Sequence, residues 1–482
     1  MEKQQQKQFY FRLTPYYQDI WEKLSKLISK QFESIDDLIH TLQDINYQII
    51  PQFYQSQIKN LKINKYHFPK QGEYFPYQSL RASIEFLQKK YNINFLKDLL
   101  PQIQKSALNS QHLFKDINYE ILILKADSQQ TLSLSKQQTL SINSLAFFNS
   151  LLDVHNLAYF HKEKYDDQIQ IGILSFEQLY VRQLTTSEAQ ERIKCLLYYF
   201  YESFKINENQ KIQYHRLVLD NPPKWDQIDE PISIQVNIQT QGMEESDAFY
   251  QVDFANKYLQ IHQNIPSLTQ EEVIFTIRPD IYPVLLISDM LNDNEAIIIE
   301  GARMFCNYTG YSSSFRFSGP SPYLKLKDIS AIIAIDALVS SSVVQKQCEK
   351  NKVFRELNKA YIGFKGIKPQ NQIYNLKQNT ISTGGWGCGV FGGNQYLKFL
   401  QQLIAAQLAK KDLVYSAYKD KDRQKQFEQI YSQIIKNKIN TKQLLDIILN
   451  FANQTYVYNF PANEKKEKNE NFYDYLQKQL RK

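Results

Sequence analysis

A pair of adjacent carboxylates is the first feature of the sequence that could do chemistry. Glu271 and Glu272 follow Gln270 just before an apolar run, and Ser267 lies three residues before Gln270, in the spacing of a capping box. The pair is therefore predicted to occupy the first turn of a helix, where the helix dipole alone favours acidic residues. Adjacent helical residues point about 100° apart, so at most one carboxylate could face a ligand squarely. A solvated helix start and an acid/base site both remain open.

A glycine cluster directly before an amphipathic helix is the second such feature. The stretch ISTGGWGCGVFGGNQYLKFL (381–400) holds six of the 14 glycines: Gly384, Gly385, Gly387, Gly389, Gly392 and Gly393. Glycine-rich backbone at a helix N-terminus presents N–H groups that suit phosphate. We see no strand–loop–helix followed by an acidic residue about twenty positions later, as a dinucleotide fingerprint requires, and no GK[ST] of a Walker loop. A phosphate cradle is the favoured prediction over a tight structural turn.

Tyrosines after a predicted strand form the third feature. NYTGY, which ends at Tyr311, follows the apolar run EAIIIEGA. Ligands commonly bind to loops at the strand ends of α/β sheets. A ligand contact and a packed aromatic corner are equally compatible with these residues.

The elements that must position these features change in character along the chain. Up to about residue 205, apolar residues recur at helical spacing, and from YHRLVLD onward short strands appear. EEVIFTI and YPVLLISDML are then predicted helices, whereas EAIIIEGA, ISAIIAIDAL, KAYIGF and DLVYSAY are predicted strands. Apolar strands alternating with helices indicate an α/β domain whose sheet is covered on both faces.

Three regions follow from this pattern. We predict a helical accessory region over residues 1–205, an α/β domain over 206–455 and a charged C-terminal tail over 456–482. The tail combines the charge-rich run NEKKEKNE with a short possible helix. We expect it to be either mobile or bound to a partner, and a simple solvated tail is the favoured interpretation.

Composition limits the function classes and the location. The net charge of +7 is spread thinly, without the basic stripe of a nucleic-acid binder, so no direct DNA binding is expected. Four cysteines without CxxC or Cys/His metal spacing predict no metal site and reduced thiols in the cytoplasm or nucleus. The start, MEKQQQKQFYF, lacks the apolar core of a signal peptide, and no window approaches a membrane span.

The order of several segments resembles the poly(ADP-ribose) glycohydrolase family over residues 130–420. These segments are QVDFAN, QEEVIF, NYTGYSSSFRF, ISAIIAIDAL, ELNKAYIGF, TGGWGCGVFGG and DLVYSAY, with SKQQTLSINSLAFFNSL and SFEQLYVRQL in the helical part. The resemblance implies a macrodomain-like mixed sheet flanked by helices, with an N-terminal mainly helical accessory region. It also implies hydrolysis of ribose–ribose O-glycosidic bonds of poly(ADP-ribose), with ADP-ribose or its polymer as partner and with no cofactor.

The resemblance assigns roles to individual residues. Glu272, the second glutamate of QEE, matches the catalytic acid/base, and Glu271 matches the group that holds the ribose hydroxyls, assisted by Asn256. The remaining matches to substrate-binding positions are Gln270, Tyr311, Tyr418, Gly387, Gly389, Phe391, Gly392 and Gly393. A single glutamate can act first as acid and then as base in such a hydrolysis.

The sequence departs from the family pattern at two places. Gln260, Ile261 and His262 stand where the family has three glycines that wrap the diphosphate, and Gly385 stands where it commonly has Asn. Two hypotheses follow. The protein is a working glycohydrolase with an altered diphosphate loop, or it is a pseudoenzyme that serves as an ADP-ribose reader or as a structural subunit of a larger assembly.

Overall fold

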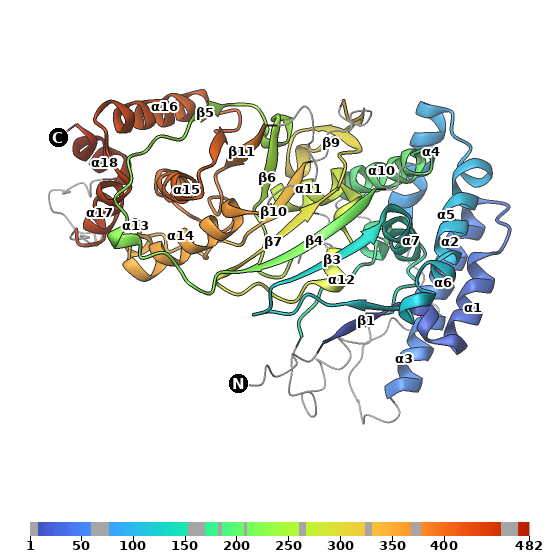
Figure 1. Ribbon diagram of the computed structural model, residues 1–482. Helices are drawn as coiled ribbons and strands as arrows, with labels where there is room; N and C mark the ends of the chain where they lie inside the picture. The colour runs from blue at the N-terminus through green and yellow to red at the C-terminus, as the bar shows by residue number, and fades with distance from the viewer. Residues whose placement is uncertain are drawn as a thin grey trace, which may run out of the picture. The chain divides into compact units, whose positions relative to one another are not determined.

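An eight-stranded β-sheet is the largest sheet of the computed structural model (Figure 1). The structure describes residues 8–58, 77–152, 169–181, 186–206, 210–259, 267–322, 330–367, 377–454 and 471–481. Along the sheet the strands follow the order β3 (Gln130–Ser135), β4 (Lys211–Val218), β7 (Glu295–Glu300), β10 (Ala331–Ala334), β6 (Ala248–Asp253), β11 (Lys377–Gly384), β12 (Asp412–Ser416) and β5 (Val236–Gln239). The pairs β10–β6, β6–β11, β11–β12 and β12–β5 are parallel, so these five strands end at one edge of the sheet.

The chain divides into two compact units. Unit 1 comprises Met1–His215, Tyr258–Met290 and Ile299–Ile329, and unit 2 comprises Arg216–Lys257, Leu291–Ile298 and Ser330–Lys482. The division runs through β4 and β7. The predicted boundaries after residues 205 and 455 stay a prediction.

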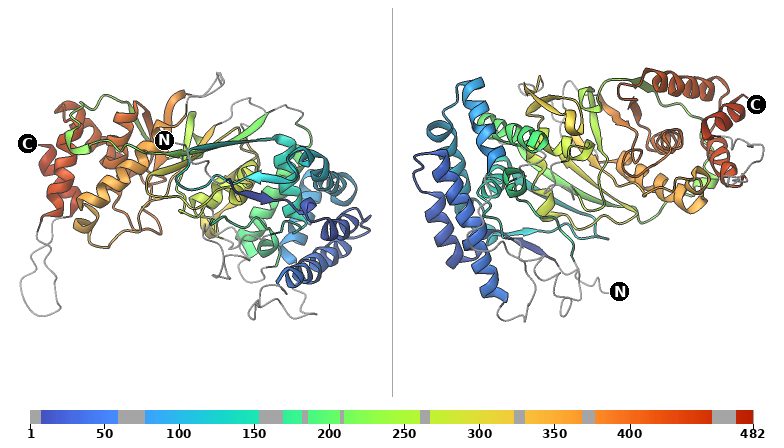
Figure 2. Two further views of the ribbon diagram at one scale, coloured as in Figure 1. Left: turned by 60° about the horizontal axis from the view of Figure 1, so that its bottom comes forward. Right: turned by 180° about the vertical axis from the view of Figure 1, so that it is seen from behind.

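Unit 1 is mainly helical, as the apolar spacing predicts. Its α-helices are α1 (Gln18–Ile28), α2 (Ile35–Asp44), α3 (Ile50–Ile58), α4 (Gln78–Tyr91), α5 (Leu100–Leu108), α6 (Ser110–Leu113), α7 (Lys136–Phe147), α9 (Glu177–Val181), α10 (Thr186–Ser203), α11 (Gln270–Ile277) and α12 (Val284–Ile287). In α1, for example, Ile20, Leu24 and Ile28 recur at four-residue spacing and are buried. Figure 2 shows the N-terminal helices, in blue, side by side in both views.

Unit 2 carries the parallel strands and a second group of helices. These are α13 (Val344–Gln347), α14 (Lys350–Lys365), α15 (Gln395–Ala409), α16 (Lys421–Lys436), α17 (Thr441–Ala452) and α18 (Phe472–Leu480). Their core includes an aromatic cluster in which the ring of Phe399 on α15 lies 4.9 Å from those of Tyr415 on β12 and Phe427 on α16. Such edge and tilted contacts contribute about 0.5–1.5 kcal/mol each beyond their buried area.

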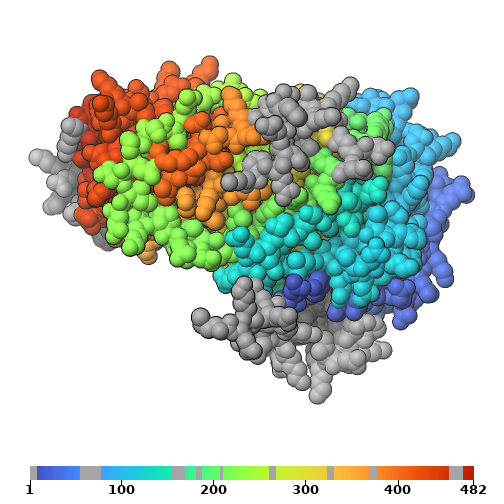
Figure 3. Space-filling view, in the orientation of Figure 1, coloured from blue at the N-terminus to red at the C-terminus, as the bar shows by residue number. Residues whose placement is uncertain are grey.

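The segment before β5 packs against the C-terminal helices of the same unit. Tyr431 on α16 donates a hydrogen bond to the carbonyl of Ile234 (2.7 Å), and the N–H of Thr441 on α17 donates one to Glu230 (2.9 Å). Figure 3 shows this segment, in light green, beside the red C-terminal helices. Among the described residues, no helix combines the length and the apolar character needed to cross a membrane.

Two predicted elements are wrong. KAYIGF, predicted as a strand, lies inside α14, where Val353, Leu357 and Phe364 share the buried face. YPVLLISDML, predicted as one helix, contains only the short α12. A short apolar run has no periodicity that separates a buried strand from a buried helix, so the surrounding packing decides.

The expectation of a solvated tail is also wrong for its last part. Helix α18 buries Phe472, Leu476 and Leu480 in the core of unit 2. Asn471 caps the helix by accepting a hydrogen bond from the N–H of Asp474 (2.9 Å). The charged run NEKKEKNE, residues 463–470, lies outside the described residues.

Candidate functional site

The adjacent glutamates occupy the first turn of α11 in unit 1, as predicted. Thr269 is the N-cap, so the expectation that Ser267 takes part in the cap is wrong. The pair Thr269 and Glu272 has the T-x-x-E spacing of a capping box, which the sequence contains and which was missed. Both glutamates are buried: Glu271 is 5% exposed and Glu272 is 0% exposed. A solvated helix start is thereby excluded.

The two carboxylate oxygens of Glu272 have different surroundings. Oε2 accepts hydrogen bonds from the backbone N–H of Thr269 (2.9 Å) and from its hydroxyl. Oε1 is buried and has no hydrogen-bond partner among the residues that the structure describes. A buried polar atom without a partner is costly unless a ligand or water uses it. One oxygen is thus fixed, and the other is available for proton transfer.

Tyr311 lies on a tight turn beside the start of α11. The turn joins β8 (Cys306–Thr309) to β9 (Arg316–Pro320), and the N–H of Ser312 donates a hydrogen bond to the carbonyl of Leu268 (2.8 Å). Gly310 has φ +77°, and a β-carbon there would lie 2.1 Å from the carbonyl oxygen of Ser314, so this position requires glycine. Both predictions for the tyrosines therefore stay compatible with the structure, because the half-buried Tyr311 also belongs to an aromatic corner.

In unit 2, three predicted ligand contacts follow parallel strands at the same sheet edge. Asn256 comes after β6, the glycine cluster after β11, and Tyr418 after β12. Neighbouring β6, β11 and β12 are parallel, so their carboxyl ends lie side by side. This edge is where open α/β sheets bind ligands. Tyr418 has φ +32°, a backbone region that non-glycine residues rarely adopt.

The glycine cluster forms a closed loop between β11 and α15, here named the glycine loop (residues 385–393). The N–H of Gly393 donates a hydrogen bond to the carbonyl of Gly387 (2.9 Å), and that of Gly392 donates to Gly389 (3.0 Å). Gly387 and Gly392 have φ +72° and +69°, which glycine adopts at low cost. The strand–loop–helix that the sequence seemed to lack is therefore present, and Asp412 follows α15.

Three consecutive amides of the glycine loop are available for a ligand. The backbone N–H groups of Gly389, Val390 and Phe391 make no hydrogen bond to any described residue. Gly389 and Val390 are exposed and Phe391 is half-buried. Successive unpaired N–H groups of this kind form a concave anion-binding surface. In contrast, the N-terminus of α15 itself is capped by the side chain of Asn394, which accepts from Tyr396 and Leu397.

The predicted site residues belong partly to unit 1 and partly to unit 2, and three of them lie outside the described residues. Gln270, Glu271, Glu272 and Tyr311 belong to unit 1, whereas Asn256, Tyr418 and the glycine loop belong to unit 2. Gln260, Ile261 and His262, the predicted altered diphosphate loop, lie outside the described residues. Among the described residues, no group of three or more His, Cys, Asp or Glu side chains could hold a metal ion.

The sheet, its helices and these site elements define a macrodomain-type α/β protein with an N-terminal helical region. Sequence models of two domains match the chain: the helical domain of poly(ADP-ribose) glycohydrolase over residues 87–216, and its macro domain fold over residues 222–425. The chain belongs to the poly(ADP-ribose) glycohydrolase family. The predicted fold class and family are thus confirmed.

Two proteins that are named poly(ADP-ribose) glycohydrolases are similar to this chain over part of their length. Poly(ADP-ribose) glycohydrolase 2 of Caenorhabditis elegans is 29% identical over 319 residues, which are 59% of this chain and 62% of that protein. Poly(ADP-ribose) glycohydrolase 1 of Arabidopsis thaliana is 25% identical over 356 residues, 59% of this chain and 64% of that protein. The chain therefore spans less than two thirds of either relative.

A solved structure of poly(ADP-ribose) glycohydrolase from Thermomonospora curvata is 12% identical and covers 43% of this chain and 77% of that chain. Its TM-score is 0.27.

Proposed function

We propose that this protein hydrolyses ribose–ribose O-glycosidic bonds of poly(ADP-ribose) and releases ADP-ribose, with Glu272 as the catalytic acid/base. The observation that carries the proposal is the buried carboxylate of Glu272, which has one oxygen fixed by Thr269 and the other without a hydrogen-bond partner among the described residues. A group that must first give and then take a proton needs this combination of a fixed orientation and one oxygen without a competing hydrogen bond.

The reaction is then a two-step use of one carboxyl group. Glu272 donates its proton to the bridging oxygen as the bond between that oxygen and the anomeric carbon breaks, which leaves an oxocarbenium-like ribose. The resulting carboxylate accepts a proton from water as the water oxygen bonds to the anomeric carbon. The products are ADP-ribose and a polymer shorter by one unit, and Glu272 regains its proton.

The ligand-binding roles follow the family match together with local geometry. Glu271 and Asn256 hold the ribose hydroxyls, and Gln270 contributes to the same contacts. The amides of Gly389 and Phe391 receive the diphosphate, because within the described part of the chain they are unpaired N–H groups, and they lie in a loop whose shape depends on glycine. Tyr311 and Tyr418 supply aromatic contacts to the ligand.

A second candidate function rests on a specific observation in the sequence. Gln260, Ile261 and His262 put three side chains where the family has glycines. Loss of a diphosphate contact weakens the transition state as well as the ground state. In this candidate the protein is a pseudoenzyme that reads ADP-ribose or serves as a structural subunit of a larger assembly.

Hydrolysis of labelled poly(ADP-ribose) separates the two candidates. The wild-type chain is expected to release ADP-ribose, and Glu272→Gln is expected to lower the rate about 10²–10⁴-fold. Glu349→Gln, which changes an exposed acid at the N-terminus of α14, is the matched control and is expected to keep full activity.

Absence of release by the wild type would exclude the enzyme. Calorimetry with free ADP-ribose then divides the second candidate: binding supports a reader, and no binding leaves the structural subunit.

A further inference from the structure

Lys398 is a buried lysine that lies beside both ends of the glycine loop. It lies in the first turns of α15 and is 2% exposed. A β-carbon on Gly387 would lie 3.3 Å from its Cε, and one on Gly393 would lie 3.1 Å from the same atom. Its Nζ lies 4.2 Å from the ring centroid of Trp386, the residue that precedes Gly387. The lysine therefore occupies the space that side chains on the loop would need.

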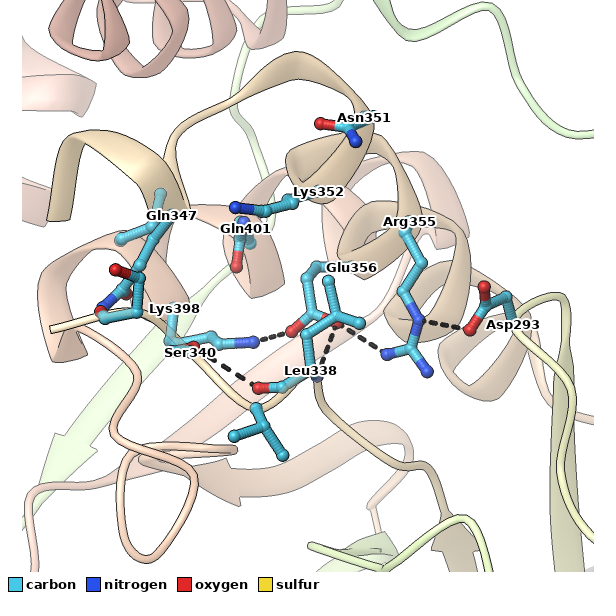
Figure 4. A pocket seen from close by; sticks show the side chains of 13 residues that line it. Asp293, Leu338, Ser340, Gln347, Asn351, Lys352, Arg355, Glu356, Lys398 and Gln401 are labelled. Carbon is cyan, nitrogen blue, oxygen red and sulfur yellow. Dashed lines mark hydrogen bonds and ion pairs between the residues drawn. The ribbon is translucent and has the colours of Figure 1, made fainter. Parts of the chain in front are cut away.

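Glu356 on α14 holds Lys398 in this place. Its Oε2 forms an ion pair with Nζ of Lys398, and its Oε1 accepts hydrogen bonds from the N–H of Leu338 (3.1 Å) and from Arg355 (2.6 Å). Figure 4 shows these contacts on the wall of a cavity of about 430 Å³ in unit 2. Leu338 belongs to the segment after β10, so the pair connects this segment, α14 and α15.

Two further hydrogen bonds connect the segment after β10 and helix α13 to the glycine loop. The N–H of Ser340 donates to the carbonyl of Phe391 (2.8 Å), and the side chain of Gln347 donates to that of Gly392 (3.3 Å). Gln347 also accepts from the N–H of Asn394, directly after the loop (2.8 Å). The loop is thus held from several sides, with the lysine at its two ends.

A buried ion pair is weak evidence for stability, because the cost of removing two charges from water offsets their attraction. Apolar side chains of the same volume would fill this space at little cost. The position of Lys398 over the ring of Trp386, in the space that β-carbons on Gly387 and Gly393 would need, suggests that the pair specifies the shape of the loop instead.

We propose that Lys398, held by Glu356, is a positioning residue that keeps the glycine loop in the shape that presents its free amides to a diphosphate. The ligand in this statement rests on the proposed function. The role of Lys398 in fixing the shape of the loop does not depend on the proposed function. The shape of the loop and the affinity for the ligand can be measured separately.

Hydrogen exchange of the ligand-free full-length chain tests the loop. The variant Lys398→Met/Glu356→Gln removes both charges while Gln keeps an acceptor for Leu338. The matched control is Arg216→Met/Glu295→Gln, which removes another fully buried ion pair of unit 2, in β4 and β7. We expect the hydrogen-bonded amides of Cys388, Gly392 and Gly393 to exchange at least about tenfold faster in the first variant, and at the wild-type rate in the control. Unchanged exchange in the first variant, or equal acceleration in the control, overturns the proposal.

Affinity and kinetics test the consequence for the ligand. We expect the Lys398→Met/Glu356→Gln variant to bind ADP-ribose about tenfold more weakly and to raise KM with little change in kcat, as for a lost ground-state contact. A loss confined to kcat, or an unchanged affinity, overturns the proposal. If the wild-type chain binds no ADP-ribose, the proposed function fails, and the exchange measurement alone decides whether the pair positions the loop.

Discussion

Thr269 and Glu272 are joined by two hydrogen bonds to a single carboxylate oxygen, one from the backbone N–H at 2.9 Å and one from the threonine hydroxyl. The group that caps α11 is therefore the same group that we propose as the acid/base. Capping fixes the orientation of the carboxylate and leaves Oε1 without a partner among the described residues. Stability of the helix start and orientation for catalysis are coupled through Thr269.

Thr269→Val tests this coupling, because it removes the hydroxyl donor but keeps the backbone N–H. Hydrogen bonds to charged groups contribute about 1.5–3 kcal/mol, so kcat/KM on poly(ADP-ribose) is expected to fall about 10–100-fold. Loss of the cap is expected to lower the free energy of unfolding by about 1 kcal/mol. Thr269→Ser retains the hydroxyl, so its kcat/KM and its free energy of unfolding should stay close to those of the wild type. A fully active Val variant would show that the hydroxyl has no catalytic role.

Gly387→Ala and Gly389→Ala separate the shape of the glycine loop from its contacts with a ligand. Gly387 has φ +72°, and a β-carbon there would lie 2.5 Å from Cβ of Ala337, so Gly387→Ala is expected to cost more than about 1 kcal/mol of unfolding free energy. A β-carbon on Gly389 would meet nothing within 4 Å, so the stability of Gly389→Ala should stay within about 0.5 kcal/mol of wild type.

Calorimetry on the same two variants measures the ligand contact. The new methyl of Gly389→Ala would stand beside the free amides that we assign to the diphosphate, so its affinity for ADP-ribose is expected to fall although its stability does not. Unchanged affinity of a stable Gly389→Ala variant would remove Gly389 from the proposed contacts. Chemical denaturation of each variant gives its free energy of unfolding, with which the change in affinity is compared.

Features that depend on contiguous residues could be predicted from the sequence. The helix start at Gln270, the glycine loop before α15 and most strands follow from local periodicity and turn residues. KAYIGF was wrongly predicted as a strand, because its apolar run fits a buried strand as well as the buried face of α14. The ion pair of Lys398 and Glu356 joins residues far apart in the chain, and no local spacing encodes such a contact.

The burial of the C-terminal helix could not be predicted for a different reason. The charged run that precedes it dominates the composition of the last residues, and FYDYLQKQL alone contains little more than two helical turns. Isolated helices of that length are marginal in water, so its stability comes from packing that the sequence does not display. Phe451 of α17 supplies part of that packing, with ring centroids 5.0 Å from both Phe472 and Tyr475.

Leu476→Ala tests whether α18 is part of the core of unit 2. Leu476 is 0% exposed, and truncating a buried leucine typically costs about 2–5 kcal/mol, so the free energy of unfolding measured in urea is expected to fall by that amount. Lys478→Ala, on the exposed side of the same helix, is the control and should change it by less than about 0.5 kcal/mol. Equal free energies of unfolding for the two variants would show that α18 is not part of the core and that the tail is solvated.

Alkaline pH provides a test of the buried thiol of Cys348. Burial raises the pKa of Cys348 to about 12, whereas the pKa of a cysteine in an unfolded chain is about 8.5. Between these values the unfolded chain has lost the thiol proton and the folded chain has kept it, so fewer protons are bound in the unfolded state. The free energy of unfolding must then decrease as the pH rises, by about 1.4 kcal/mol per pH unit for this group.

Cys348→Ala removes this contribution while the other titrating groups stay in place. Compared at pH 8, 9 and 10 in urea, the stability advantage of the wild type over the variant is expected to be constant below about pH 8.5 and then to shrink by about 1.4 kcal/mol per unit. The cost of the cavity left by the missing sulfur does not depend on pH, so it shifts the whole difference without changing its slope. A difference that stays flat up to pH 10 would mean that Cys348 ionises as readily in the folded chain as in the unfolded one.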